Sequence, residues 1–286
     1  MGEKRASPDA LASGSIAIVT GGLRGLGRAM SLGLLAAGHR VAAVGHIQSD
    51  VEEMAGLVTA RAADFLPLVA DLRVPAECDR IFSATRARFG RNPDILVNNA
   101  GLTFTFIDPT RFRREKPQRF WECGDGIIQA VMDTNFVAAD QMSRRAVPWM
   151  LQAGWGRIVN VTTKLDTMNR AGSSPYGPSK AALEMATEIW AKELAGSGVT
   201  VNIVNPGAGA NTPGMAAEMR VRSAAAAVPL LVEPGDMVAP LLFVVSRAAD
   251  QVNGFRFDAN TWRAGVDPRT LARPAGFTLH PEGGWD

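Results

Sequence analysis

Tyr176, the single tyrosine among the 286 residues, is followed four positions later by Lys180. Residues four apart lie one turn from each other on the same face of a helix. A free phenol, with a pKa of about 10, is a poor acid–base catalyst at neutral pH. A neighbouring ammonium favours the phenolate and is expected to lower the pKa of Tyr176 toward the working range. The pair predicts proton transfer at a substrate oxygen, and a core tyrosine beside a surface lysine is the alternative.

A glycine-rich segment could bind a phosphate group. Residues 20–27 read TGGLRGLG, between an apolar run and a helical pattern. Glycines let the chain turn sharply, and they let backbone N–H groups approach a pyrophosphate at the helix N-terminus. The spacing differs from the common GxGxxG fingerprint, and glycine turns also occur without ligands. The position between a first strand and a helix nevertheless indicates a dinucleotide site.

Short β-rich runs alternate with helical ones, as in βαβ units around a parallel sheet. We expect an α/β fold: one parallel sheet of about seven strands in a single domain, with helices on both faces. The predicted strands are 15–20, 40–44, 65–69, 95–98, 157–161, 199–204 and 254–257. The predicted helices follow the glycine turn and cover 75–89, 126–152 and 176–194. The domain is expected over 14–260, between a flexible start, 1–13, and a tail, 261–286.

Composition excludes several classes of protein. Thirty basic and 28 acidic residues give a net charge of +2, so no basic field indicates nucleic acid or anionic lipid as a partner. Cys78 and Cys123 are far apart, and the three histidines lack metal-ligand spacing, so neither a disulfide scaffold nor a metal site is expected. The polar N-terminus lacks a signal-peptide core, and no membrane span is expected. We therefore expect a cytoplasmic location.

Five motifs occur in the order typical of the short-chain dehydrogenase/reductase (SDR) family, which the chain resembles from residue 15 to about residue 260. They are TGGLRGLG at 20–27, Asp71, NNAG at 98–101, YGPSK at 176–180, and NPG at 205–207 with Thr212 beyond. The resemblance implies a doubly wound, Rossmann-type sheet and a nicotinamide cofactor, with Asp71 near the adenine and 206–212 beside the nicotinamide. The cofactor-binding residues that it implies are Gly21, Leu23, Gly25, Leu26, Gly27, Asp71, Leu72, Asn99, Ala100, Gly101, Tyr176, Lys180, Pro206, Gly207 and Thr212.

The choice between NAD and NADP depends on the end of the second strand. An acid there would bind the adenosine ribose and repel a 2′-phosphate, but residues 44–48 read VGHIQ and the first carboxylate is Asp50. Arg24, just before Gly25, is placed to contact a 2′-phosphate, a contact worth about 1.5–3 kcal/mol. We expect NADP(H), with Arg24 and His46 among the cofactor residues. A solvated Arg24 and a plain loop histidine are the alternative.

The resemblance also implies the remaining catalytic residues. Thr163 stands thirteen residues before Tyr176, where the family carries a serine whose hydroxyl holds the substrate carbonyl. Threonine keeps the donor and adds a methyl group that restricts the rotamer. Asn135 matches the helix asparagine that anchors a proton-relay water to Lys180; an amide that satisfies a helix carbonyl is the alternative. The implied reaction is hydride transfer between nicotinamide and a ketone or secondary alcohol.

Three regions depart from a compact family member. The segment 102–130 contains a basic run, 111–116, and the aromatic residues Phe104, Phe106, Phe112, Phe120 and Trp121. It is either a substrate-side loop for an anionic or aromatic substrate or a surface excursion packed by its own aromatics. Residues 208–232 are expected to form the substrate loop and lid. The tail could cover a neighbouring subunit, cover its own active site, or extend freely.

The leading hypothesis is an NADP(H)-dependent oxidoreductase of a small carbonyl or alcohol substrate, which the sequence does not name. The alternative is a nicotinamide-binding sensor or scaffold with impaired catalysis, indicated by Thr163 and the altered C-terminus. Apolar surface on the 126–152 and 176–194 helices predicts a homodimer or homotetramer, and core packing alone is the other explanation.

Overall fold

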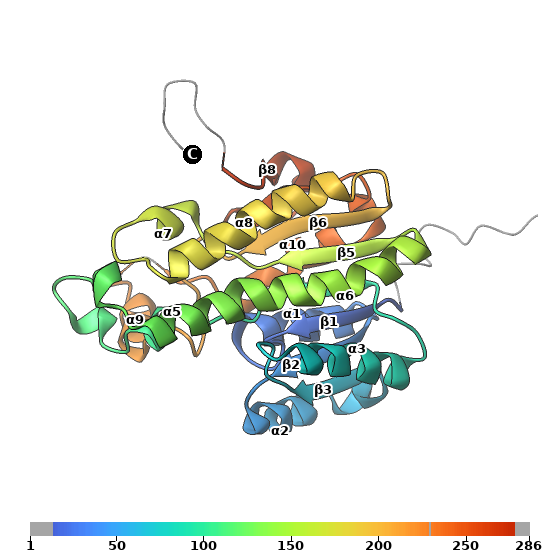
Figure 1. Ribbon diagram of the computed structural model, residues 1–286, viewed down its shortest axis with the longest axis horizontal. Coiled ribbons are helices and arrows are strands. Elements are labelled where there is room, and N and C mark those ends of the chain that lie inside the picture. The colour runs from blue at the N-terminus through green and yellow to red at the C-terminus, as the bar shows by residue number, and fades with distance from the viewer. Residues whose placement is uncertain (1–13, 229, 278–286) are drawn as a thin grey trace, which may run out of the picture.

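The computed structural model describes residues 14–228 and 230–277, which hold one eight-stranded sheet. Its strand order is β3-β2-β1-β4-β5-β6-β7-β8 (Figure 1). All neighbouring pairs from β3 to β7 are parallel, and β8 runs antiparallel to β7. The predicted doubly wound α/β fold is confirmed, with an eighth strand in addition. The predicted flexible start, 1–13, and residues 278–286 of the tail lie outside the described residues.

The central strands are short apolar runs buried on both faces. In β1, Ala17 and Val19 join one core cluster while Ile16 and Ile18 join the other, and all four are 0% exposed. Such burial on both faces is typical of parallel sheets. The strands are β1 Ile16–Thr20, β2 Arg40–Gly45, β3 Phe65–Val69, β4 Ile95–Asn98, β5 Gly156–Asn160, β6 Val199–Asn205, β7 Phe255–Asp258 and β8 Arg273–Pro274.

Helices cover both faces of the sheet. The core on one face includes residues of α1 (Gly25–Ala36), α2 (Gln48–Leu57) and α10 (Val238–Val245). The core on the other face includes residues of α3 (Pro75–Phe89), α6 (Ala138–Ala153) and α8 (Tyr176–Glu193). Figure 1 shows α3, α6 and α8 in front of the sheet and α1 and α10 behind it.

The predicted 126–152 helix is continuous but not uniform. It consists of α5 (Asp125–Met132), a π-helical turn (Asp133–Val137) and α6. Short helices fill the connections: α4 (Phe104–Ile107), α7 (Leu165–Asn169) and α9 (Ala217–Ala224). The 3₁₀ helices are Thr59–Asp64, Arg111–Arg113, Phe120–Glu122, Pro234–Met237, Arg247–Ala249, Ala259–Thr261 and Pro268–Leu271.

The described part of the tail returns to its own sheet. β8 pairs with β7, and the Ala275 N–H donates to the Gly254 carbonyl at 2.8 Å. In the described residues no helix is long and apolar enough to cross a membrane. Nor do the residues so described contain a group of three His, Cys, Asp or Glu that could hold a metal ion.

The parallel topology gathers the motifs. The carboxyl ends of β1, β4, β5 and β6 lie at one edge of the sheet. The glycine turn, the NNAG motif, Thr163 and the NPG motif follow these four ends. Ligands of doubly wound folds bind outside this edge.

Candidate active site

Two loops brace each other where β1 and β4 end. The Thr20 hydroxyl accepts hydrogen bonds from the backbone N–H groups of Asn99 (2.9 Å) and Ala100 (3.1 Å). The Asn99 amide donates to the carbonyls of Thr20 (2.9 Å) and Gly21 (3.1 Å). A Cβ at Gly27 would lie 2.0 Å from the Gly21 oxygen, so only glycine allows this close approach. The glycine turn and the NNAG motif therefore form one unit at the N-terminus of α1.

The glycine turn faces the segment after β6. Gly25 begins α1 with a φ of +55°, and a Cβ there would lie 3.4 Å from the Cβ of Thr212. The structure thus brings together the predicted pyrophosphate loop and the segment predicted to lie beside the nicotinamide.

Residues that follow β7 hold the NPG loop in place. The Asn205 amide donates to Asp258 at 2.6 Å, and its oxygen accepts from the Gly207 N–H at 2.7 Å. Asn260 donates its backbone N–H to the Pro206 carbonyl at 3.2 Å. Sequence reasoning noted that this C-terminal segment departs from the family pattern, but it did not predict that Asp258 and Asn260 support the loop.

Three of the predicted cofactor residues have core side chains. Leu23 is 1% exposed, Leu26 packs against the same core cluster, and Leu72 is buried in the cluster on the opposite face. Leu23 and Leu72 can therefore offer a ligand only backbone groups, whereas the Leu26 side chain is partly exposed.

The predicted adenosine side contains more charge than the sequence indicated. Arg24 is half-exposed, and its guanidinium lies 3.8 Å from the Asp50 carboxylate at the start of α2. Arg73 binds both oxygens of Asp71, at 2.9 and 2.7 Å, and lowers the pKa of that carboxyl. The exposed His46 lowers the pKa of Asp71 further, to a smaller extent. Sequence reasoning missed the contacts of Asp50 and Arg73.

The predicted proton-transfer residues converge at the start of α8. Tyr176 is the first residue of this helix, and Lys180 follows one turn later and is 4% exposed. The Lys180 ammonium donates to the carbonyl of Val161 at 2.8 Å. Thr163, two residues further along, is 8% exposed, and its side chain lies close enough to Tyr176 to lower the pKa of the phenol. A phenol, a hydroxyl and an ammonium group therefore share one buried site.

Burial controls the titration of this site. It lowers the pKa of Lys180 from 10.5 to about 8. It raises the pKa of Tyr176, and the Thr163 side chain opposes that rise. The expectation of a lowered pKa for Tyr176 is therefore wrong for this structure, because desolvation of the phenol dominates.

Asn135 occupies the π-helical turn and is 1% exposed. Its oxygen accepts from the Leu102 N–H at 2.7 Å, and its amide donates to the Leu102 carbonyl at 3.1 Å. The amide also donates to the Ser179 hydroxyl at 3.0 Å. Ser179 in turn donates to the Tyr176 carbonyl at 2.7 Å. Asn135 thus connects the segment after β4 to the first turn of α8. Sequence reasoning missed its contact with Ser179. π-helical turns are frequent at functional sites.

Gly101 keeps space open between two of these groups. A Cβ built there would lie 3.3 Å from the Asn135 oxygen and 3.4 Å from the Lys180 nitrogen. Both polar atoms therefore border the same point at the end of the NNAG motif.

Comparison with known proteins identifies the family. The family model described as short chain dehydrogenase matches residues 15–222. This chain is a short-chain dehydrogenase. It is an oxidoreductase of CH–OH and C=O groups.

Its curated relatives include enzymes of two kinds. The 3-oxoacyl-[acyl-carrier-protein] reductase FabG of Salmonella typhimurium is 30% identical over 194 residues, which cover 68% of this chain and 73% of that protein. The 2-dehydro-3-deoxy-D-gluconate 5-dehydrogenase of Escherichia coli is 34% identical over 252 residues, which cover 85% and 92%.

The solved structures similar to this one include a reductase and a putative dehydrogenase. A 3-ketoacyl-(acyl-carrier-protein) reductase from Brucella melitensis complexed with NADH has a TM-score of 0.73 and 25% identity, covering 86% of this chain and 97% of its own. A putative NAD(P)-dependent gluconate 5-dehydrogenase from Beutenbergia cavernae with bound NADP has a TM-score of 0.71 and 30% identity, covering 86% and 95%.

In this short-chain dehydrogenase a buried ion pair stands behind Thr163. Arg256, on β7, lies 2.9 Å from Glu184, on α8, with side chains 4% and 0% exposed. Arg256 also donates to the Thr163 carbonyl at 3.1 Å. Burial raises the pKa of Glu184, and Arg256 opposes the rise. The pair links the hydroxyl-bearing segment to the far strands of the sheet.

The inserted segment 102–130 contacts the predicted lid. The hydroxyls of Thr103 and Thr105 donate to the carbonyl of Gly214, each at 2.9 Å. Arg113 forms an ion pair with Glu218 on α9. The segment and α9 lie at the same end of the molecule as α7 (Figure 1).

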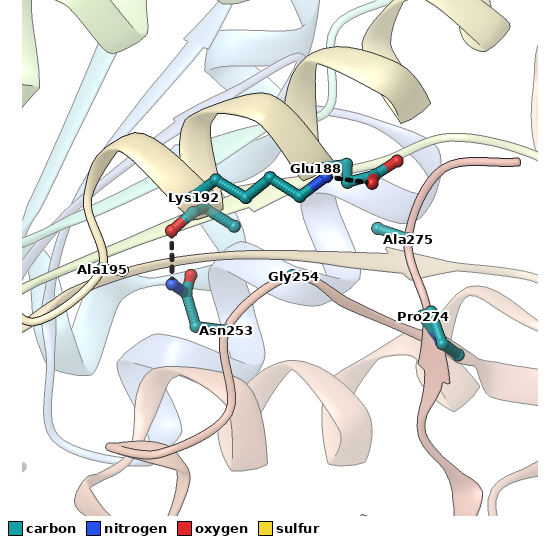
Figure 2. A pocket seen from close by; sticks show the side chains of 8 residues that line it. Glu188, Lys192, Ala195, Asn253, Gly254, Pro274 and Ala275 are labelled. Carbon is teal, nitrogen blue, oxygen red and sulfur yellow. Dashed lines mark hydrogen bonds and ion pairs between the residues drawn. The ribbon is translucent and has the colours of Figure 1, made fainter.

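One open hollow lies elsewhere. Glu188, Lys192, Asn253, Gly254, Pro274 and Ala275 are among its lining residues, between the end of α8 and β8 (Figure 2). Figure 2 also shows the 2.5 Å ion pair of Lys192 with Glu188 and the hydrogen bond from the Asn253 amide to the Ala191 carbonyl. At a rise of about 1.5 Å per residue, this end of α8 is about 20 Å from Tyr176. The hollow is separate from the proton-transfer site.

Proposed function

We propose that this enzyme is an NADP(H)-dependent oxidoreductase that interconverts a ketone and a secondary alcohol, with Tyr176 as the general acid and base. One observation carries the proposal. The Tyr176 phenol, the Thr163 hydroxyl and the buried Lys180 meet at the edge of the sheet where the glycine turn and Thr212 also lie.

The residues have distinct roles in reduction. The Thr163 hydroxyl and the Tyr176 phenol hold the substrate carbonyl oxygen and polarise it. As the hydride adds to the carbon, the C=O double bond becomes a single bond and its oxygen takes the proton of Tyr176. The positive charge of Lys180 stabilises the phenolate that this transfer leaves. Oxidation reverses each step, with the phenolate as the base.

The loops fit a dinucleotide cofactor. The close approach at Gly27 and the N-terminus of α1 present backbone N–H groups to a pyrophosphate. Gly101 leaves space beside Lys180, which would bind the nicotinamide ribose. When bound, the nicotinamide supplies or accepts the hydride.

The preference for NADP rests on charge. No carboxylate stands at the end of β2, and Arg24 and the exposed His46 border that position. Asp50 lies 3.8 Å from Arg24, and a 2′-phosphate would compete with it for the guanidinium. Among the similar structures one holds NADP and another NADH, so the family leaves the choice to such local residues.

Exposed apolar side chains support a homodimer or homotetramer. Three lie on the α5–α6 helix and two on α8, with exposed fractions between 36% and 46%: Ile128, Trp149, Leu151, Met185 and Ile189. Light scattering should give a mass that is a multiple of the monomer mass. The double substitution of Trp149 and Ile189 by aspartate should shift it to the monomer, and an unchanged mass would contradict this interface.

Deuterium transfer tests the function. The enzyme is incubated with NADPH or NADH deuterated at nicotinamide C4 and with a panel containing a thioester, a diketone, a keto-sugar and a keto-acid. The proposal expects deuterium on the carbinol carbon of at least one product, and faster transfer from NADPH. If the cofactor binds but no label is transferred in either direction, the sensor or scaffold alternative replaces the enzyme.

A further inference from the structure

Two arginines lie beside the aromatic ring that packs on Tyr176. The ring centroids of Phe104 and Tyr176 are 4.6 Å apart. The guanidinium carbon of Arg111 lies 4.0 Å from the Phe104 centroid, and that of Arg170 lies 5.7 Å from it. These distances place the Arg111 guanidinium within about 9 Å of the Tyr176 ring centroid.

The two positive charges are close and lack an acidic partner. Within the described residues, neither arginine has a carboxylate within ion-pair distance. The nearest candidate for Arg111 is Asp108, which is engaged by the Arg114 guanidinium at 3.2 Å and by the Thr110 hydroxyl at 2.7 Å. Asp108 still acts on Arg111 through its charge, and Asp166, which is paired with Lys164, acts on Arg170 in the same way. An anion at the two arginines would therefore compete only with carboxylates that already have other partners.

Arg111 is held in place. It is half-buried, and it donates to the carbonyl of Gly172, four residues before Tyr176. Burial lowers the pKa of Arg111, the charge of Arg170 adds to the effect, and the charge of Asp108 opposes it. A guanidinium has five donors in a planar fork, so others remain for a ligand.

We propose that Arg111 and Arg170 form a subsite for a carboxylate, which makes the substrates hydroxy acids and oxo acids. The inference rests on the proposed function, because it assumes that the reacting carbonyl binds to Tyr176. The separation from Tyr176 suits a carboxylate several carbons from that carbonyl. Guanidinium groups bind carboxylates through paired hydrogen bonds. The carboxylate is unchanged by the reaction.

Matched pairs of substrates test the subsite. Levulinate and 5-oxohexanoate are compared with their methyl esters, which differ by one negative charge. We expect kcat/KM to favour the acid, and Arg111→Gln to reduce this acid-to-ester ratio about tenfold to hundredfold. Arg170→Gln should act in the same direction. Dihydroxyacetone phosphate tests whether a phosphate is the anion instead.

Two further variants separate specificity from folding. Lys116→Gln removes one positive charge from an exposed position of the same segment and should leave the ratio unchanged. Arg111→Lys keeps the charge but loses the planar fork, so it should recover only part of the preference. The midpoint of thermal unfolding of each variant is compared with that of the wild type, so that a lost preference is not confused with a lost fold.

The outcomes divide clearly. Equal turnover of acids and esters by the wild type, or an acid preference that survives Arg111→Gln, overturns the subsite and leaves the proposed function standing. An Arg111-dependent preference for dihydroxyacetone phosphate alone overturns the carboxylate assignment. If nothing is turned over, the proposed function fails. The rise in melting temperature on addition of 5-oxohexanoate then tests the subsite. The subsite is supported if Arg111→Gln abolishes this rise, and it is overturned if the rise is absent or unchanged.

Discussion

The Glu184 carboxylate and the Arg256 guanidinium form a 2.9 Å ion pair between α8 and β7, and both side chains are almost completely buried. Neither residue belongs to a family motif that the sequence displayed. Arg256 also donates to the carbonyl of Thr163, whose hydroxyl faces Tyr176. We infer that the pair positions the hydroxyl-bearing segment from behind.

Glu184→Gln should destabilise the protein by about 1.5–3 kcal/mol, because the buried Arg256 guanidinium then keeps only the more distant Asp258 carboxylate, at 3.4 Å. Urea unfolding measures this loss, and kcat should fall while the KM for NADPH stays within about twofold, because the cofactor loops are elsewhere. Asp79→Asn is the control: it breaks an exposed pair with Arg145, which contributes only about 0–1 kcal/mol. A loss in Glu184→Gln as small as in the control would contradict the role of the pair.

Thr163→Val should lower kcat by about 10²–10³-fold, because valine keeps the shape of threonine but removes the donor that holds the carbonyl oxygen. Thr163→Ser restores the hydroxyl and should stay within about tenfold of the wild type. Steady-state kinetics of the purified variants checks both. An active Thr163→Val enzyme would show that Tyr176 alone polarises the substrate.

The reductive kcat/KM for NADPH should fall above a pH of about 8. Burial lowers the pKa of Lys180 to about 8, so the free enzyme loses this positive charge as the pH rises through that value. Below it Lys180 is charged and supports the phenolate of Tyr176. In Lys180→Arg the group stays charged, and the falling limb of the pH profile should move to higher pH. If the falling limb of the pH profile stays at the same pH in Lys180→Arg, a group other than Lys180 causes it.

Arg24→Ala should raise the KM for NADPH about tenfold to hundredfold and leave the KM for NADH nearly unchanged, since only NADPH carries the 2′-phosphate. Arg28→Ala, which removes a nearby arginine paired with Glu53, is the control. If Arg24→Ala raised the KM for NADH as much as the KM for NADPH, Arg24 would not determine the preference for NADP.

The sequence predicted the strands and the motif-bearing loops well, because continuous apolar runs and glycine spacing are local signals. The first strand, expected at 15–20, is β1 Ile16–Thr20. The two-residue strand β8 carries no such pattern and forms only by pairing with β7. Helix α2 was not predicted, since it buries Met54 alone.

Contacts between residues far apart in the chain could not be predicted from the sequence. Glu184 looks like an ordinary polar helix residue until the fold sets it against Arg256, 72 positions away. The pKa of Tyr176 depends on burial, which a spacing of four residues does not reveal. The inserted segment left two explanations open, and the structure has features of both: Phe104 packs on Tyr176, whereas the exposed Phe120 and Trp121 pack on each other.

The most direct test of the account is the activity of Tyr176→Phe with the best carbonyl substrate, followed by the absorbance of NADPH, beside a fluorescence titration of NADPH binding. The account predicts that the variant binds NADPH with an affinity within a few-fold of the wild type and that kcat falls by about 10²–10⁴-fold, the usual contribution of general acid catalysis. A variant that binds NADPH and retains wild-type turnover would contradict the assignment of Tyr176 as the proton donor.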